Sequence, residues 1–418
     1  MTEAVPQLSY DNISTNALKV VNRLATSGYQ AYLVGGCVRD LLLGKVPKDF
    51  DVATDAHPED VRGLFRNSRL IGKRFRIVHV HFGPEIVEVA TFRAPHTARS
   101  HQSNHSDGGM ILSDNVFGTF EEDVFRRDFT MNALYYDPEA DAIYDLVEGV
   151  KDVEAGQIRL IGNPESRCRE DPVRMLRAIR FRARLDFVIE PATAEPIRRL
   201  GFLLQDIPAA RLFEEVLKLF MTGYGVRAYE LMLEYDLLAW MFPDTRRTME
   251  SFPTGKLIRA ALVSTDNRIA ASMPVTPAFI FASFLWYPFV EEKQRLENEG
   301  VTNIEAFQIA AETVIARQQL FTSIPRRFTG MMRDIWNLQF RLPVRHGRRA
   351  ERLVTHKRFR AAYDFLLLRE EAGEDLNGLG KWWTEYQECD EEGRRQLVRS
   401  LPGPGSQRSR RRKKKERG

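Results

Sequence analysis

Two aspartates separated by one phenylalanine, Asp49 and Asp51 in the segment KDFD, have the spacing in this chain that most favours chemistry. Side chains two positions apart on a strand point to the same face, so both carboxylates can converge while Phe50 packs behind them. Mg²⁺ prefers oxygen ligands, and two such ions can neutralise charge on the attacking and leaving oxygens of a phosphoryl-type transfer. The pattern therefore predicts a metal-dependent transferase in which Asp49 and Asp51 bind the metal ions.

A pair of glycines lies upstream of the two aspartates, in LVGGCVRD. The apolar run predicts a strand, and Gly35 and Gly36 then allow backbone N–H groups to approach a phosphate without an intervening Cβ. Arg39, on the short helix that follows, can pair with the negative charge of a triphosphate. The glycine turn and the aspartates together indicate a triphosphate substrate.

Strands and short helices must position these residues, and they dominate the chain up to about residue 160. We predict a first helix over 12–26, strands in AYLVGG and KDFDVAT, and a short helix in VRDLLLG between those strands. RIVHVHFG and EIVEVATFR predict a hairpin around residues 83–84. Alternation along its second strand places Glu88 on the face opposite to Val87 and Val89.

Helical patterns take over in the rest of the chain. VRMLRAIRFRARL, ARLFEEVLKLFMTG and GVRAYELMLEYDLLAWM each carry apolar residues at helical spacing. Residues 323–363 interleave arginines with aromatics, which fits either a surface that faces nucleic acid or solvated helices over an aromatic core. We therefore predict an α+β protein with a catalytic mixed-sheet head over 1–160 and a helical neck over 161–222 that binds nucleotide and RNA. A helical body over 223–400 that binds RNA and a flexible basic tail over 401–418 are predicted to follow.

The positive charge of the chain is concentrated at its C-terminus. The formal net charge is +4, but residues 408–418 hold eight arginines and lysines against one glutamate and carry +7, so residues 1–407 carry −3. We predict that this tail is flexible and contacts RNA in a salt-dependent way, and the alternative is a solubilising terminus. The predicted RNA contacts are Arg410, Arg411, Arg412, Lys413, Lys414 and Lys415.

The remaining bulk properties favour a cytoplasmic protein. The three cysteines have neither disulfide-framework nor zinc-site spacing, which indicates a reducing compartment. No uninterrupted apolar stretch is long enough to span a membrane, and the N-terminus has no signal-peptide pattern.

Three motifs in order, LVGGCVRDLLLGKVPKDFD, RRDFTMNALYYD and REDPVRMLRAIRF, resemble the class II branch of the polymerase β superfamily of nucleotidyltransferases. That branch contains bacterial poly(A) polymerases and tRNA CCA-adding enzymes, and RLIGKRFRIVHVHFGPEIVEVATFR, IRLIGNPE and the basic tail resemble the poly(A) polymerases more closely. The resemblance implies a polymerase β-like nucleotidyltransferase head with two Mg²⁺ ions at Asp49 and Asp51. It also implies that the incoming nucleotide is bound by Gly35, Gly36 and Arg39.

The motif RRDFTMN adds further residues to the site by the same resemblance. It implies that Arg127 and Asn132 contact the nucleotide and that Asp128 is a catalytic acid. A third metal-site carboxylate should lie on a strand beside the first two, and strand alternation gives Glu88 a suitable position. An ion pair with Arg126 or Arg127 is the alternative role for Asp128. The third carboxylate therefore stays open between Glu88 and Asp128.

Base selection is placed by the resemblance in the helix that begins at EDPVR. Asp171 and Arg174 can present an acceptor and donors to a base edge, with Arg177 assisting them. At ~100° per residue Arg180 lies about half a turn away from Asp171 around a helix, so it should hold another part of the site. Taken alone, Asp171 would be a helix N-cap and the arginines a solvated face.

The predicted reaction adds AMP from ATP to RNA 3′ ends, such as those of mRNA and small RNA fragments, without a template. The RNA 3′-hydroxyl attacks the α-phosphorus and pyrophosphate leaves. CCA addition to tRNA is the nearest alternative, because it uses the same residues. A non-catalytic RNA-binding protein is the alternative from another class, and the intact paired carboxylates argue against it. Proteins of RNA degradation or RNA chaperones are further possible partners.

Overall fold

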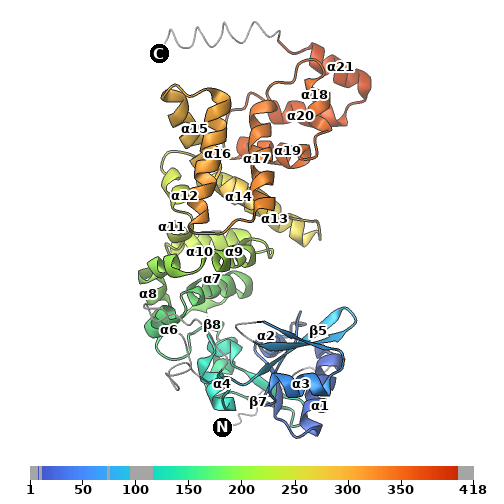
Figure 1. Ribbon diagram of the computed structural model, residues 1–418, viewed down its shortest axis with the longest axis vertical. Coiled ribbons are helices and arrows are strands. Elements are labelled where there is room, and N and C mark those ends of the chain that lie inside the picture. The colour runs from blue at the N-terminus through green and yellow to red at the C-terminus, as the bar shows by residue number, and fades with distance from the viewer. Residues whose placement is uncertain (1–7, 9–11, 73–75, 95–115, 403–418) are drawn as a thin grey trace. The chain divides into compact units, whose positions relative to one another are not determined.

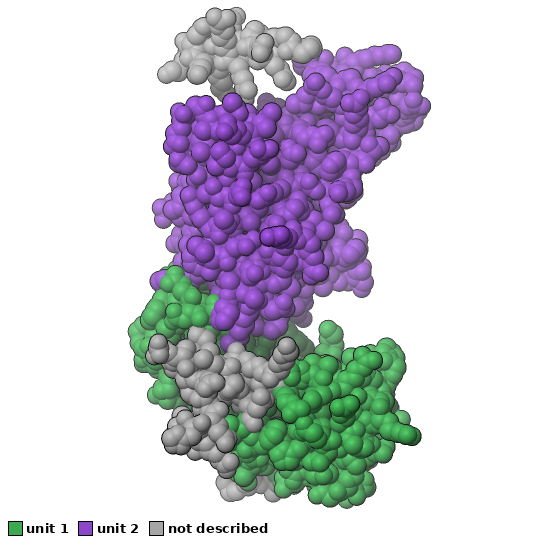
Figure 2. Space-filling model, viewed as in Figure 1, with its two compact units in different colours: residues 1–207, 234–237 green, residues 208–233, 238–418 purple. Residues whose placement is uncertain are grey.

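The computed structural model describes residue 8 and residues 12–72, 76–94 and 116–402. The chain divides into two compact units, and Figure 2 colours them separately. Unit 1 comprises residues 1–207 and 234–237, and unit 2 comprises residues 208–233 and 238–418. The boundary after residue 207 falls inside the predicted neck, and the division into head, neck and body stays a prediction.

A seven-stranded mixed sheet forms the centre of unit 1 (Figure 1), with the strand order β3-β4-β5-β2-β1-β6-β7. Neighbouring strands are antiparallel, except that β2 and β5 are parallel. The strands are β1 (Ala31–Val34), β2 (Asp51–Thr54), β3 (Ser68–Ile71), β4 (Ile77–Phe82), β5 (Glu85–Thr91), β6 (Tyr135–Asp137) and β7 (Ala142–Tyr144). The sheet and the helices that follow it confirm the predicted α+β class, and the hairpin forms as predicted, with Phe82 opposite Glu85.

Short helices cover this sheet and are held by local capping contacts. Helix α1 (Thr15–Thr26) packs against β1 and β2, and α3 (Pro58–Leu64) packs against β3, β4 and β5. The N-cap hydroxyl of α4 (Phe120–Arg126), on Thr119, accepts a hydrogen bond from the Glu122 N–H, and the Glu122 carboxylate accepts one from the Thr119 N–H. Val124 of α4 is buried in one cluster with Ala53 of β2. Since alternate residues of a strand share a face, Asp51 lies on the α4 side of the sheet.

The start of β2 differs from the prediction. Strand β2 begins at Asp51, whereas Asp49 lies in a bend before it, so the prediction that both aspartates lie on one strand is wrong for Asp49. Asp51 pairs with Val34, the last residue of β1, and the chain turns away at Gly35, where φ is +80°. Because β1 ends there, it offers no partner for Asp49. Phe50 between the two aspartates is buried, as predicted.

Unit 1 continues beyond the sheet with short helices and a second small sheet. Helix α2 (Gly36–Leu42) follows the glycine turn, and the 3-10 helix η3 (Thr130–Asn132) precedes β6. The remaining elements are α5 (Gly149–Glu154), β8 (Gln157–Ile158), α6 (Pro164–Glu170), α7 (Val173–Leu185), β9 (Val188–Ile189), α8 (Pro191–Arg199) and the 3-10 helix η4 (Gly201–Asp206). Strands β8 and β9 pair in parallel.

Unit 2 is helical throughout its described residues. Its helices are α9 (Ala209–Phe220), α10 (Gly225–Glu234), α11 (Leu238–Met241), α12 (Pro243–Thr248), α13 (Thr254–Ala270), α14 (Pro277–Phe284), α15 (Trp286–Asn298), α16 (Asn303–Gln319), α17 (Arg326–Arg341), α18 (Arg349–Val354), α19 (Phe359–Glu371), α20 (Leu379–Glu388) and α21 (Glu391–Arg399). The rings of Phe289 and Trp336 stack in its core with centroids 4.7 Å apart, and Leu342, Trp383 and Tyr386 belong to a separate cluster nearer the C-terminus. None of the helices in the described part of the chain is both long and apolar enough to cross a membrane.

Candidate active site

Two carboxylates meet on neighbouring strands in the middle of the main sheet. Asp51 of β2 and Glu88 of β5 are directly paired in the parallel register, and both side chains are accessible to solvent. The pKa of Asp51 is raised to about 6, first because the surrounding protein displaces water, and further because Glu88 and Asp49 repel its negative charge. Arg127 opposes this shift. Asp51 therefore lies where burial and two neighbouring carboxylates disfavour its charged form.

Glu88 has a second neighbour on the hairpin. The Nε2 atom of His79 on β4 lies 3.2 Å from a Glu88 carboxylate oxygen. Within the described residues, no three side chains of histidine, cysteine, aspartate or glutamate are close enough together to hold a metal ion by themselves. The carboxylate oxygens of Asp51 and Glu88 are nevertheless the type of ligand that Mg²⁺ prefers.

The glycine turn lies beside Arg127, although the two are far apart in the sequence. Gly35 has φ +80°, a conformation that side-chain-bearing residues rarely adopt, and its N–H donates to the Leu134 carbonyl at 3.0 Å. A Cβ atom at Gly35 would lie 3.6 Å from Nη1 of Arg127. The turn therefore needs glycine for its backbone conformation, and the N–H of Gly35 is already bonded within the sheet.

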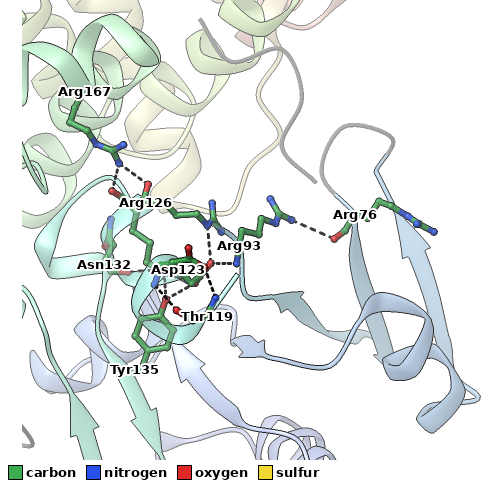
Figure 3. Close-up of polar contacts among 10 residues, drawn as sticks. Arg76, Arg93, Thr119, Asp123, Arg126, Asn132, Tyr135 and Arg167 are labelled. Carbon is green, nitrogen blue, oxygen red and sulfur yellow. Dashed lines mark hydrogen bonds and ion pairs between the residues drawn. The ribbon is translucent and has the colours of Figure 1, made fainter. Parts of the chain in front are cut away.

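A buried carboxylate, that of Asp123, fixes the position of Arg127. Figure 3 shows Asp123 beside Arg126 and Tyr135. Asp123 of α4 is 1% exposed, and it accepts hydrogen bonds from Nη2 of Arg127 at 3.0 Å and Nε of Arg126 at 2.8 Å. Nε of Arg127 also donates to the Tyr135 hydroxyl at 2.7 Å. Burial alone would raise the pKa of Asp123, but the two arginines hold that pKa well below its usual range. Arg127 is therefore held as a cation against the sheet.

Asp128, the next residue, is paired with helix α7. Its carboxylate accepts a hydrogen bond from Nε of Arg177 at 2.6 Å and another from the Phe129 N–H at 2.8 Å. Burial opposes ionisation, but Arg177 and the Phe129 N–H lower the pKa of Asp128 to about 2. The predicted alternative, an ion pair with Arg126 or Arg127, is wrong, because Asp123 takes both of those arginines.

Asn132 and Arg39 extend the same network into the interior. Asn132 donates from Nδ2 to Asp128 at 3.4 Å and accepts from Nη1 of Arg39 at 2.6 Å. Arg39 is 2% exposed, and its Nε also donates to Asp40 at 2.9 Å. In this structure the Arg39 guanidinium thus lies inside unit 1, and its predicted contact with a triphosphate stays a prediction.

The junction of α6 and α7 presents the residues expected to read the base. Asp171 ends α6, and its carboxylate accepts from the Val173 N–H at 3.3 Å where α7 begins. Nη1 of Arg174 donates to Glu170 at 2.6 Å and to the Arg167 carbonyl at 2.8 Å. Its Nε and Nη2 groups make no hydrogen bond to any residue of the described ranges, and the Arg174 side chain is 9% exposed.

The predicted placement of Arg180 opposite Asp171 assumed one continuous helix, and that assumption is wrong. Asp171 has an extended backbone with φ −144°, so the angle per helical residue does not apply to it. The guanidinium of Arg180 lies over the Phe181 ring, 5.5 Å from the centroid. Those of Arg39 and Arg177 lie 5.4 and 5.6 Å from the same ring. Phe181 therefore brings together three of the predicted arginines.

Sequence reasoning missed three residues of the network, namely Asp123, Tyr135 and Arg167. Asp123 precedes Arg126 and Arg127 by three and four positions, a spacing that favours helical ion pairs and was a usable signal. Nη2 of Arg167 donates to the carbonyls of Arg126, at 2.6 Å, and Arg127. No local pattern indicates this contact or the Tyr135 contact. The predicted RNA contacts Arg410, Arg411, Arg412, Lys413, Lys414 and Lys415 lie outside the described residues.

The mixed sheet, the glycine turn and the adjoining carboxylates define a nucleotidyltransferase head, and comparisons with known proteins agree. The model "Poly A polymerase head domain" matches residues 31–159. Two further models match residues 186–249, "Probable RNA and SrmB- binding site of polymerase A", and residues 299–417, "Polymerase A arginine-rich C-terminus".

Curated relatives give the particular family. Poly(A) polymerase I of Escherichia coli O6:H1 is 51% identical over 419 residues, which cover 98% of this chain and 90% of that protein. Poly(A) polymerase I of Haemophilus influenzae is 48% identical over 94% of this chain and 88% of its own length. The chain belongs to the poly(A) polymerase I family. A CCA-adding enzyme of Lactobacillus helveticus is more distant, at 37% identity over 54% of this chain and 55% of its own length.

Solved structures with a similar fold are CCA-adding enzymes. The Bacillus stearothermophilus enzyme in complex with CTP has a TM-score of 0.58 and 25% identity, over 93% of this chain and 88% of that one. The Thermotoga maritima enzyme complexed with tRNA has a TM-score of 0.62 and 19% identity, over 97% of this chain and 91% of that one. The similarity to the Thermotoga maritima structure shows that the two proteins share a fold.

Proposed function

We propose that this chain carries out the adenylyl transfer of its family at the carboxylates of Asp51 and Glu88, which are paired on the neighbouring strands β2 and β5. Membership of the poly(A) polymerase I family makes it a polynucleotide adenylyltransferase, which adds AMP from ATP to RNA 3′ ends without a template. The bond from the RNA 3′-oxygen to the α-phosphorus forms as the bond to pyrophosphate breaks. The single observation that carries the location is the Asp51–Glu88 register, together with the raised pKa of Asp51.

Asp49, Asp51 and Glu88 are the proposed ligands of two Mg²⁺ ions. Bound Mg²⁺ would neutralise negative charge on the attacking and leaving oxygens. The carboxylate donor set fits this cation, and the two carboxylates that neighbour Asp51 support it. Asp128 is less suited to a metal, because Arg177 already neutralises its carboxylate. We therefore favour Glu88 over Asp128 as the third metal-site carboxylate, and give Asp128 the role of holding α7 against the head.

Arg127 is proposed to contact the triphosphate beside the glycine turn formed by Gly35 and Gly36. The Arg127 guanidinium lies next to Gly35, and its positive charge acts to lower the pKa of Asp51. Asp123 and Tyr135 fix that guanidinium before any ligand binds, so little side-chain entropy is lost on binding. Preorganised positive charge of this kind stabilises negative charge that develops during transfer.

Asp171 and Arg174 are proposed to select adenine, with Arg177 and Arg180 supporting the helix that carries them. The Nε and Nη2 donors of Arg174, which make no hydrogen bond within the described ranges, support this role. Arg167 donates a hydrogen bond to the Arg127 carbonyl, and the Arg167 carbonyl accepts one from Arg174. Arg167 therefore connects the proposed phosphate contact to the proposed base contact. We further propose a cytoplasmic location and, on the earlier resemblance alone, RNA-degradation or RNA-chaperone proteins as partners.

The test supplies the purified chain with ATP or CTP and with either an unstructured RNA or a tRNA that lacks its terminus. We expect long A-tracts on the unstructured RNA and little use of CTP. Asp51→Ala should lower the rate about a hundredfold or more. The variant removes a carboxylate that is proposed to hold the Mg²⁺ ions, and these ions neutralise charge in the transition state. Efficient CTP addition to the tRNA without A-tracts would instead support the CCA-adding alternative. Unchanged addition by Asp51→Ala would overturn the proposed site.

A further inference from the structure

Arg167 of α6 contacts two separate parts of the candidate active site. Its Nη2 group donates to the carbonyls of Arg126, at 2.6 Å, and Arg127 at the end of α4. Figure 3 shows the Arg167 guanidinium directed at the backbone of Arg126. Its Nη1 group donates to the Glu170 carboxylate, and the Arg167 carbonyl accepts from Nη1 of Arg174 at 2.8 Å. Arg167 therefore joins the end of α4 to the start of α7.

The contact of Arg167 with α4 is a helix cap. The last carbonyls of a helix have no partner within the helix, and a cation near that end is favoured by the helix dipole. Helix α4 ends at Arg126 and Arg127 is its C-cap residue, so Arg167 bonds to both of these terminal carbonyls. The side chain of Arg127 is held separately by Asp123. Arg167 therefore fixes the backbone of the residue whose guanidinium is proposed to contact the triphosphate.

The contact of Arg167 with α7 passes through a shared carboxylate. One oxygen of Glu170 accepts from Nη1 of Arg167 and, at 2.6 Å, from Nη1 of Arg174. The same Nη1 group of Arg174 also donates to the Arg167 carbonyl. Both of these acceptors belong to α6, and Arg167 shares one of them. The position of the Arg174 guanidinium therefore depends on where Arg167 holds α6.

The position of Arg167 favours arginine for its donor geometry rather than for burial. The Arg167 side chain is 14% exposed, and its Nε is buried without a hydrogen-bond acceptor within the described ranges. Burial and the neighbouring charge of Arg174 lower the pKa of Arg167. A buried donor without a partner is unfavourable, so an apolar side chain would suit simple packing better. Only the planar fork of a guanidinium can donate to two carbonyls and a carboxylate at once.

We propose that Arg167 is a positioning residue for nucleotide selection, which couples the base contact at Arg174 to the triphosphate contact at Arg127. A base held by Arg174 then stabilises the arrangement in which Arg127 meets the triphosphate. This proposal rests on the function proposed above, since that function assigns Arg127 and Arg174 to the nucleotide. Such coupling is reciprocal, so a triphosphate at Arg127 strengthens the base contact by the same factor. Without Arg167 both contacts remain, but each forms independently of the other.

Isothermal titration calorimetry of the full chain, with Mg²⁺ and without RNA, measures the affinities for ATP, CTP and inorganic tripolyphosphate. Tripolyphosphate reaches only the phosphate contact, and the ratio of ATP to CTP affinity reports the base contact. Arg167→Met should weaken ATP binding about tenfold and lower the preference for ATP over CTP. The tripolyphosphate affinity should change less than about twofold, because without a base there is no coupling to lose. General damage to the fold would weaken all three ligands equally, and that outcome would overturn the proposal.

A conservative variant and a control accompany Arg167→Met. Arg167→Lys keeps the positive charge at the end of α4 but lacks the planar fork, so it should lose ATP affinity as Arg167→Met does. Arg169→Met is the matched control, because Arg169 also lies on α6 and pairs with Glu165, with both side chains exposed. The control should leave all three affinities within about twofold of the parent. An equal loss of ATP affinity in Arg169→Met would refute the role of Arg167.

A double-mutant cycle separates this coupling from the proposed function on which it rests. Arg174→Ala should abolish the preference for ATP over CTP, and adding Arg167→Met to it should then weaken ATP binding less than about twofold. If the two losses of ATP affinity were additive, the coupling would be refuted while the base contact at Arg174 stood. If Arg174→Ala kept the full preference for ATP, the base contact itself would be wrong, and the coupling would fall with it.

Discussion

Removing the Arg177 side chain tests whether Asp128 is a structural anion that Arg177 neutralises. In the structure, Nη2 of Arg177 lies 2.5 Å from Asp128, and the Asp128 side chain is only 12% exposed. Arg177→Met keeps most of the apolar stem and removes the charge. The variant therefore leaves a largely buried carboxylate whose remaining described contacts are the Phe129 N–H and the amide of Asn132.

The expected loss of stability follows from the pKa of Asp128. A carboxyl group with a pKa of about 2 in the folded chain and 3.8 in the unfolded chain favours folding by about 2.5 kcal/mol at neutral pH. Arg177 provides the largest lowering of this pKa, and the Phe129 N–H provides the next. Breaking a buried ion pair typically costs about 3–5 kcal/mol, but the Arg177 side chain is 34% exposed and partly screened. We therefore expect Arg177→Met to lower the free energy of unfolding by about 2 kcal/mol.

Urea unfolding of the full chain, followed by far-UV circular dichroism, measures this change. All five tryptophans lie in unit 2, so tryptophan fluorescence reports on the other unit and serves as an internal reference. Arg184→Met is the matched control, because Arg184 lies on the same helix, is more exposed than Arg177, and pairs with Asp40, which Arg39 also neutralises. The control should cost less than about 1 kcal/mol.

The pH dependence distinguishes this mechanism from general damage to the fold. Because the pKa of Asp128 is lowered in the folded chain, its contribution is complete above pH 3.8 and disappears as the pH falls through about 2. The difference between Arg177→Met and the parent should therefore shrink over that range. A difference that stays constant down to pH 2, or equal stabilities at pH 7, would refute the assignment of Asp128 as the partner of Arg177.

Three further predictions concern the head. Glu88→Gln should move the pKa of Asp51 down from about 6 by removing a neighbouring negative charge, and an NMR carboxyl titration that still gives about 6 would contradict this. Asp123→Asn should destabilise the chain by about 3 kcal/mol and raise the KM for ATP more than it lowers kcat, because the guanidinium beside the glycine turn loses its carboxylate. Equal KM values for ATP in Asp123→Asn and the parent chain would show that the Asp123 carboxylate only supports the fold. Gly35→Ala should cost about 1–2 kcal/mol in thermal unfolding and also reduce activity, whereas Gly44→Ala, at φ +66°, should be strained but fully active.

The sequence by itself determined the local structure around the site. The glycine pair after an apolar run predicted the turn that leads into α2, and period-two alternation predicted both the β4–β5 hairpin and the outward position of Glu88. Charge counting located the basic tail. These features depend on residues within a few positions of one another, so backbone preference and burial periodicity are sufficient to predict them.

Only the tertiary structure decided which distant residues are partners. Asp51 and Glu88 pair because β5 lies beside β2 in the sheet, out of chain order, and no pattern in either strand specifies that neighbour. Asp128 pairs with Arg177 across 49 positions, although two arginines directly precede it in the sequence. The buried Asp123 forms ion pairs with those two arginines, which lie three and four positions further along the chain. A carboxylate removed from water is stabilised most by such nearby cations. The motif residues were thus readable from sequence, whereas the choice of ion-pair partner required the packing of helix and sheet that sets burial.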